Sequence, residues 1–306
     1  MERKVAGGEV AGANFIDPRA LARISDLELV ARTVVEGFIN GLHRSPYLGL
    51  SLDFAEHRPY MPGDDLRRID WRLWARTDRL YVKQFEAETN TNFVAILDVS
   101  RSMSFGSQGL TKLDYARFLV ATLAYFSRSQ RDRVGLVTFD ADIVDEVPPS
   151  AKHLEMVLHT LARARASGAG GLAVPLRKLA ERFRRRSILA VVSDFYHEPE
   201  EVVEAVRWLR YRGNDIIVFH VLDPAELEFP YDGGTSFEDL ETGLRLPVMA
   251  SELRERYRAL VREHTERLSR LFAEERIDYV LLDTARPLDH ALFDYLSSRE
   301  RLSRVR

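Results

Sequence analysis

Short apolar runs alternate with longer amphipathic segments from residue 93 onward. Because this order is typical of strands joined by helical crossovers, it predicts an α/β fold with a mostly parallel sheet flanked by helices. Phe93–Leu97 is apolar at every position, as in a strand buried on both faces. The further expected strands are Val134–Phe139, Ile188–Val192, Ile216–Leu222 and Ile277–Leu282. The expected helices are Lys112–Arg128, Lys152–Arg165, Leu176–Arg185, Pro199–Tyr211, Glu252–Glu275 and Pro287–Leu302.

Two further segments depart from this alternation. The turn at residues 140–142 predicts a hairpin that pairs the second run with Ile143–Val147, and Phe229–Val248 has the composition of a turn-rich hairpin excursion. Both are expected as additions to the sheet rather than as crossover helices.

The first 92 residues have a different character. Residues 1–14 are rich in Gly and Ala and are expected to form a flexible tail. Asp17-Pro18 predicts a helix start, and an apolar stripe predicts one amphipathic helix ending near Gly41. Candidate strands Leu50–Phe54 and Leu80–Phe85 follow. We therefore expect an N-terminal helix plus a β-rich accessory region over residues 15–92, and the α/β domain over 93–306.

Composition limits the classes of function. The 306 residues carry 44 basic and 47 acidic side chains, a formal charge of −3, which argues against a general nucleic-acid binder. The absence of cysteine excludes disulfides, thiolate metal sites and cysteine nucleophiles. No run approaches the roughly 18 apolar residues of a membrane span, and the first residues lack the apolar core of a signal peptide. We expect a cytoplasmic protein without direct membrane insertion.

Each of the five expected strands of the parallel sheet is followed by an aspartate: Asp98, Asp140, Asp194, Asp223 and Asp283. The carboxyl ends of parallel strands share one edge, where open α/β folds bind their ligands. An aspartate after a strand can also start a turn or cap the next helix, which is the interpretation favoured for Asp223 and Asp283. Serine-rich turns favour a functional role for Asp98 and Asp194.

The turn after the first run is the sharpest candidate site. Asp98, Ser100 and Ser102 alternate, so three oxygen-bearing side chains can point the same way as the chain leaves the strand. Such a set can hold a hard cation such as Mg²⁺. It can equally well stabilise the turn through hydrogen bonds to backbone N–H groups.

Residues 66–79 interleave Arg, Asp and Trp. Arg68, Trp71 and Arg76 are candidate partner contacts, because Arg and Trp are favoured at interface hot spots. The alternative, which we favour, is an ion-paired brace that Trp side chains anchor between small strands and the main domain.

The 98–102 run matches the Asp-x-Ser-x-Ser motif of von Willebrand factor A-like domains, and Asp194 lies where those domains carry a second aspartate. The upstream runs 60–71 (YMPGDDLRRIDW) and 75–80 (ARTDRL) resemble those of the bacterial domain-of-unknown-function family 58. This resemblance covers roughly residues 40–300. It implies a von Willebrand factor A-like (Rossmann-like) sheet flanked by helices.

The resemblance also implies a metal-ion-dependent adhesion-type site with Mg²⁺ or Mn²⁺ on Asp98, Ser100, Ser102 and Asp194. Its expected threonine is missing, because the Gly-rich loop reads GGLAVP at residues 170–175; Ser167 or Ser193 are the possible substitutes. The predicted partner-binding residues at this edge are Asp98, Ser102, Asp140 and Asp194.

Members of this family are often encoded beside MoxR-type AAA+ ATPases, which implies such an ATPase, or its client, as the protein partner. We therefore expect a non-enzymatic adaptor in chaperone-like assembly or maturation. Two alternatives stay open: a metal-dependent phosphoesterase-type hydrolase that uses the aspartates, and a scaffold domain with no metal.

Overall fold

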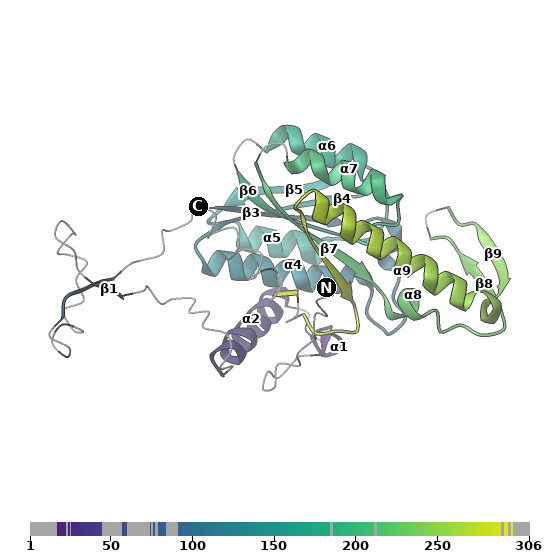
Figure 1. The fold of residues 1–306 in the computed structure, drawn as a ribbon, viewed down its shortest axis with the longest axis horizontal. Helices are drawn as coiled ribbons and strands as arrows, with labels where there is room; N and C mark the ends of the chain where they lie inside the picture. The colour runs from purple at the N-terminus through teal and green to yellow at the C-terminus, as the bar shows by residue number, and fades with distance from the viewer. Residues whose placement is uncertain are drawn as a thin grey trace, which may run out of the picture.

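The computed structural model describes residues 17–44 apart from 23 and 25, residues 57–59, 74, 76 and 79–83, and residues 91–288 apart from 184, 185, 211, 212 and 241, together with 291, 292 and 295. Within this part of the chain, a six-stranded sheet lies between two layers of helices (Figure 1). The strand order is β10-β7-β6-β3-β4-β5.

All neighbours in the sheet are parallel except β5, which pairs antiparallel with β4. The α/β fold and the β4–β5 hairpin are therefore confirmed. The strands are β3 (Asn92–Asp98), β4 (Arg133–Phe139), β5 (Ile143–Ser150), β6 (Ser187–Ser193), β7 (Asp215–Leu222) and β10 (Asp278–Asp283).

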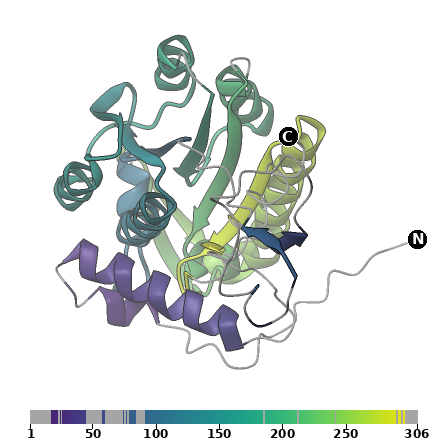
Figure 2. The same cartoon turned by 90° about the vertical axis from the view of Figure 1, so that its left-hand side faces the viewer.

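Strand β3 lies inside the sheet and shows why its sequence is apolar without a break. Side chains alternate between the faces of a strand, so both faces must be hydrophobic when both are covered. Phe93 and Leu97 belong to the core on one face, which includes α2 (Leu27–Arg44), α4 (Lys112–Ser129) and α5 (Leu154–Arg163). Val94 and Ile96 belong to the core on the other face, with α6 (Ala173–Arg182), α7 (Pro199–Arg210) and α9 (Ala250–Glu274). Figure 2 shows these two helical layers on either side of the sheet.

The single N-terminal helix predicted from the apolar stripe is wrong: the structure has two helices, α1 (Pro18–Leu21) and α2. Asp17 caps the first, with Pro18 at its first position, as the sequence predicts. The Asp26 side chain then accepts hydrogen bonds from the N–H groups of Glu28 (2.9 Å) and Leu29 (3.3 Å). This side chain starts a new helix inside a stripe whose spacing alone looks continuous. Helix α6 also begins three residues earlier than expected, at Ala173.

Two hairpins lie outside the six-stranded sheet, and a short 3-10 helix, η2 (Arg101–Ser104), follows β3. The accessory region contains β1 (His57–Pro59) paired with β2 (Tyr81–Lys83), while the predicted strand Leu50–Phe54 lies outside the described residues. Helix α8 (Pro224–Glu228) precedes the predicted excursion, which contains the hairpin β8 (Gly234–Glu238) with β9 (Arg245–Met249). In Figure 1 this hairpin lies beside one end of α9. The domain boundaries at residues 14/15 and 92/93 stay predictions.

The last predicted helix, Pro287–Leu302, is described only in part. Its Tyr295 is fully buried against the Phe93 ring, with centroids 5.8 Å apart. Among the described helices, none combines the length and the apolar composition that crossing a bilayer requires.

Two glycines give a test of the packing. A Cβ on Gly135 in β4 would lie 2.8 Å from the Val147 carbonyl oxygen and 2.9 Å from the Pro149 nitrogen, so we expect Gly135→Ala to cost about 1–3 kcal/mol through overpacking. The exposed Gly37 in α2 has no atom within 4 Å of such a Cβ, and Gly37→Ala should stabilise the protein by about 0.5–1 kcal/mol through helix propensity. Chemical denaturation of both variants measures the two signs, and equal effects would contradict the described β4–β5 contact.

Candidate functional site

Five aspartates follow the parallel strands, and the topology brings them to one edge of the sheet. Asp98 and Asp283 end β3 and β10, and the other three directly follow β4, β6 and β7. This edge is the one that the sequence predicts for a ligand or partner.

Two of the five aspartates have the structural roles that the sequence favours for them. Asp223 caps α8 in a capping box with Glu226, and it also accepts hydrogen bonds from the backbone N–H and the hydroxyl of Ser107. Asp283 accepts a hydrogen bond from the Ala285 N–H, at 2.9 Å, in the turn after β10.

The Asp98 turn is tightly hydrogen-bonded. Asp98 Oδ1 accepts a hydrogen bond from the Ser100 N–H at 2.8 Å, and its Oδ2 accepts one from the Ser193 hydroxyl at 2.6 Å. The hydroxyls of Ser100 and Ser102 lie 3.1 Å apart in a hydrogen bond to each other. The three side chains of the motif therefore gather at one place, and Ser193, one of the two serines considered as substitutes for the missing threonine, joins them.

The Gly-rich loop lies directly beside this turn. The Arg101 N–H donates to the Gly168 carbonyl at 2.8 Å, and the Ser167 N–H donates to the Val99 carbonyl at 3.1 Å. A Cβ on Gly168 would lie 1.9 Å from Asp140 Oδ2, so only glycine allows the Asp140 carboxylate to approach the loop this closely. Asp140 is thereby placed at the same edge, half-buried.

The electrostatics of Asp98 are unfavourable to its charged form. Burial, followed by the negative charge of Asp194, raises the pKa of Asp98 to about 7, although hydrogen bonds from Ser193 and Ser100 oppose this rise. The folded protein therefore disfavours the ionised form of this carboxyl group.

A buried lysine neutralises the second aspartate. Lys112 is fully buried, and its Nζ lies 2.7 Å from Asp194 Oδ2 and 2.7 Å from Glu226 Oε1. The rings of Tyr196 and Phe105 also face the ammonium, at 4.7 and 6.0 Å from their centroids. Burial alone would lower the pKa of Lys112, but the charges of Asp194 and Glu226 outweigh it and raise that pKa, so the ammonium stays charged.

Sequence reasoning missed Lys112 and Glu226. Lys112 is the first residue of α4, directly after the Thr111 cap. A helix N-terminus carries partial positive charge, so a lysine there is unfavourable unless a carboxylate compensates for it. A lysine at the start of a helix could have indicated a buried ion pair, but the sequence does not identify the carboxylate that pairs with it.

These contacts bear on whether the residues fit the cation that the family resemblance implies. Both oxygens of Asp98 accept hydrogen bonds, one oxygen of Asp194 accepts from an ammonium, and the loop lacks its threonine. In the part of the chain that the structure describes, no three acidic or imidazole side chains are arranged to hold a metal ion. The donors therefore do not fit a divalent cation, which needs free oxygens around an open centre. Calorimetry with Mg²⁺ and Mn²⁺ is the measurement that tests the implied cation site.

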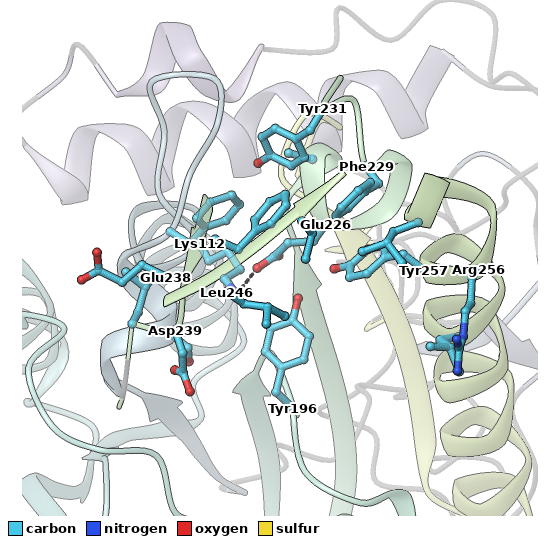
Figure 3. Close-up of a pocket in the computed structure, with 18 residues that line it drawn as sticks. Lys112, Tyr196, Glu226, Phe229, Tyr231, Glu238, Asp239, Leu246, Arg256 and Tyr257 are labelled. Atoms are coloured by element: carbon cyan, nitrogen blue, oxygen red, sulfur yellow. Dashed lines mark hydrogen bonds and ion pairs between the residues drawn. The ribbon is translucent and has the colours of Figure 1, made fainter. Parts of the chain in front are cut away.

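A cavity of about 560 Å³ opens beside this ion-paired group (Figure 3). Lys112, Tyr196 and Glu226 lie toward one another in Figure 3. Residues of α9 and of the β8–β9 hairpin line much of the remainder. Its lining includes six aromatic side chains: Phe105, Tyr196, Phe229, Tyr231, Phe237 and Tyr257. The edge thus combines a polar turn with an adjoining aromatic cavity.

The predicted Arg- and Trp-rich contacts are described only in part. Arg68 and Trp71 lie outside the described residues, while Arg76 is helical and exposed.

A buried histidine lies nearer the edge of the sheet. His220 is completely buried, and burial lowers its pKa to about 3. It is therefore neutral, and its Nδ1 is hydrogen-bonded to the Tyr279 hydroxyl at 2.7 Å.

A parallel sheet with one antiparallel edge strand, covered on both faces and carrying an Asp-x-Ser-x-Ser turn after an inner strand, is a von Willebrand factor A-like α/β fold. Residues 56–267 match the family described as Protein of unknown function DUF58. The chain belongs to this family.

Uncharacterized mycobacterial proteins are similar to the chain in sequence. Rv1480 of Mycobacterium tuberculosis is 30% identical over 233 residues, which is 74% of this chain and 73% of that protein. MAV169 of Mycobacterium avium is 26% identical over 162 residues, covering 50% of this chain and 92% of that protein.

Two solved structures from Bacteroides are similar at lower identity. An aerotolerance-related membrane protein from Bacteroides fragilis aligns with a TM-score of 0.48 at 17% identity, over 66% of this chain and 96% of that chain. The conserved hypothetical protein BatB from Bacteroides thetaiotaomicron aligns with a TM-score of 0.47 at 16% identity, over 69% and 99%.

Proposed function

We propose that the protein is a non-enzymatic interaction adaptor and that the carboxyl edge of its sheet binds a protein partner. The observation that carries this proposal is the joining of the Asp98 turn to an aromatic cavity on the same edge. Ser102 belongs to both, because it follows Asp98 in the turn and lines the cavity. Interfaces commonly place aromatic pockets at their centre and polar groups at their rim.

The partner that we propose is a MoxR-type AAA+ ATPase, with which the protein acts in chaperone-like assembly or maturation. The support for this partner is the family membership, together with the implication that members are encoded beside such ATPases. We further propose that an apolar side chain of the ATPase enters the cavity while polar groups of its surface meet Ser102 and Asp140, which are partly exposed. Asp98 and Asp194 are buried beneath this edge and support it rather than touch the partner.

The polar part of this surface is tested by Asp98→Ala. We expect binding to the purified ATPase of the same organism, measured by biolayer interferometry, to fall at least about tenfold, since the turn loses the carboxylate that orders it. Circular dichroism should show a folded variant. Unchanged affinity would contradict a role for this turn in the interaction.

The cavity is tested separately by Leu260→Glu. Leu260 lines the cavity and is 55% exposed, so a charged side chain there can remain in water and leave the fold intact. We expect affinity for the ATPase to fall by more than about tenfold, because the charge must be desolvated when the interface forms. Met156→Glu is the matched control: Met156 is 51% exposed on α5, outside the cavity lining, and its variant should bind as the wild type does. Equal losses in the two variants would argue against the cavity.

The hydrolase alternative gains no support from the described residues around the edge. His220 is buried and neutral, and His264 Nε2 is hydrogen-bonded to the Phe195 carbonyl at 3.1 Å. A metal-assisted hydrolase needs a base or a metal-bound water aimed at an open substrate position. We therefore rank the adaptor above the hydrolase.

A further inference from the structure

We propose that the Lys112 ammonium takes the place of the divalent cation at this edge, so that the adhesion-type site works with a built-in positive charge and no metal. This inference concerns the same edge as the proposed function, but it rests on the contacts of one side chain rather than on the identity of a partner.

The Lys112 charge lies between carboxylates that come from separate parts of the fold. An ammonium that leaves water is strongly destabilised unless carboxylates pair with it. Lys112 has no exposed surface, and its Nζ lies 2.7 Å from one oxygen of each of two carboxylates. Asp194 and Glu226 come from different segments, one directly after β6 and one within α8. The ammonium therefore joins the segments that follow β6 and β7, as a bound cation would.

The ammonium and a divalent cation would compete for the Asp194 carboxylate. Asp194 is the second aspartate of the implied metal shell, and its Oδ2 already accepts from Lys112. A divalent cation and an ammonium that share this carboxylate would repel each other in a site of low dielectric. The two cations are thus alternatives rather than companions.

The surroundings of the ammonium also favour it over a metal ion. Mg²⁺ dehydrates reluctantly and usually keeps several water molecules. The Tyr196 ring, at 4.7 Å, and the Phe105 ring, at 6.0 Å, instead present aromatic faces to Nζ. Aromatic faces stabilise an ammonium through cation–π attraction but offer no ligand to a hydrated metal ion. These surroundings therefore favour the lysine ammonium over a hydrated metal ion.

The missing threonine agrees with this substitution. Because Lys112 supplies the positive charge from α4, the Gly-rich loop needs no threonine hydroxyl to bind a cation. The loop still runs beside the Asp98 turn through the Arg101–Gly168 hydrogen bond of 2.8 Å. Substitution of the cation by Lys112 accounts for a loop that keeps its position and lacks its ligand.

The test is isothermal titration of the purified protein with MgCl₂ and with MnCl₂. We expect no saturable heat from the wild type with either ion. In Lys112→Met, which frees both carboxylates, we expect a saturable signal and a rise in the thermal unfolding midpoint on addition of either salt, because a ligand that binds only the folded state stabilises it. The added substitution Asp194→Asn should abolish both effects.

A second variant is used if Lys112→Met does not fold. Lys112→Met combined with Glu226→Gln removes one charge of each sign and leaves Asp194 free, so it should fold and should gain the same midpoint rise with MnCl₂. One-to-one binding to the wild type that is lost in Asp98→Ala would overturn the inference. The absence of any cation response in both Lys112 backgrounds would overturn it as well. These measurements involve no partner, so their failure is distinguishable from failure of the adaptor function.

Discussion

Replacement of Lys112 by Met is expected to lower the free energy of unfolding by about 3–5 kcal/mol, the range for removal of one partner from a buried ion pair. Lys112 is buried completely, and its two partner carboxylates have side-chain exposures of only 5% for Asp194 and 12% for Glu226. Met fills much of the same volume, so the loss measures uncompensated charge rather than a cavity. Urea denaturation near neutral pH, in buffer without divalent cations, measures it.

The control for this prediction is Lys178→Met. Lys178 also pairs with an aspartate, Asp142, at 2.5 Å, but these two side chains are 46% and 55% exposed. Water and salt screen such a pair, and its loss should leave the stability unchanged within error. If both variants lost the same stability, the burial assigned to Lys112 would be wrong.

Acidification should lessen the effect of Lys112→Met. Burial raises the pKa of Glu226, although the Lys112 charge opposes that rise. Without the ammonium, Glu226 takes up a proton more readily, which removes one of the unpaired charges as the pH falls. The difference from the wild type should therefore be smaller at acidic pH than at neutral pH.

Replacement of Asp98 by Asn is expected to stabilise the protein at alkaline pH. The pKa of Asp98 is about 7 in the folded protein, against a reference value of 3.8. A carboxyl group with a raised folded pKa binds a proton more tightly in the folded state than in the unfolded state. The stability of the wild type therefore increases as the pH falls from about 7 toward 3.8, and the full cost of the buried charge is present above pH 7.

The size of this effect follows from the distance between the folded and unfolded pKa values of Asp98. A difference of one between two pKa values corresponds to about 1.4 kcal/mol, so Asp98→Asn should exceed the wild type by up to roughly 4 kcal/mol at pH 8. The amide lacks one acceptor, for the Ser193 hydroxyl, and this loss reduces the gain. The difference should shrink below pH 7 and disappear near pH 4. Thermal unfolding of both proteins across this range measures it, and a pH-independent difference would contradict the raised pKa.

His220 provides a comparison of opposite sign. Its pKa is lowered from 6.5 to about 3, so the unfolded state binds the proton first as the pH falls. The neutral His220 thus contributes stability above pH 6.5 that decreases as the pH falls toward 3. Because this loss opposes the gain from Asp98, only the difference between wild type and Asp98→Asn isolates the carboxylate.

The sequence was sufficient for the architecture because the relevant patterns are local. A run such as Phe93–Leu97 is apolar at every position, and that pattern already requires a strand covered on both faces. The hairpin after Phe139 follows from a short polar turn between two candidate strands. The break at Asp26 was missed because a capping side chain interrupted a stripe whose apolar spacing continued through it.

The sequence predicted the part of the candidate site that lies at the ends of the parallel strands. Asp98, Asp140 and Asp194 come to one edge because their strands are parallel, and parallel pairing follows from the alternation of strands and helices. The 98–102 turn is local, and its hydrogen bonds are those that an Asp and two Ser residues form at that spacing.

The charge that completes the site was decided by the tertiary structure. Lys112 is 82 residues from Asp194 and 114 from Glu226 in the chain, and the three residues meet only when α4, the end of β6 and α8 are packed. Sequence determines the residue type and the spacing along one element. It does not determine which buried charge faces which, because that depends on how separate elements approach each other in three dimensions.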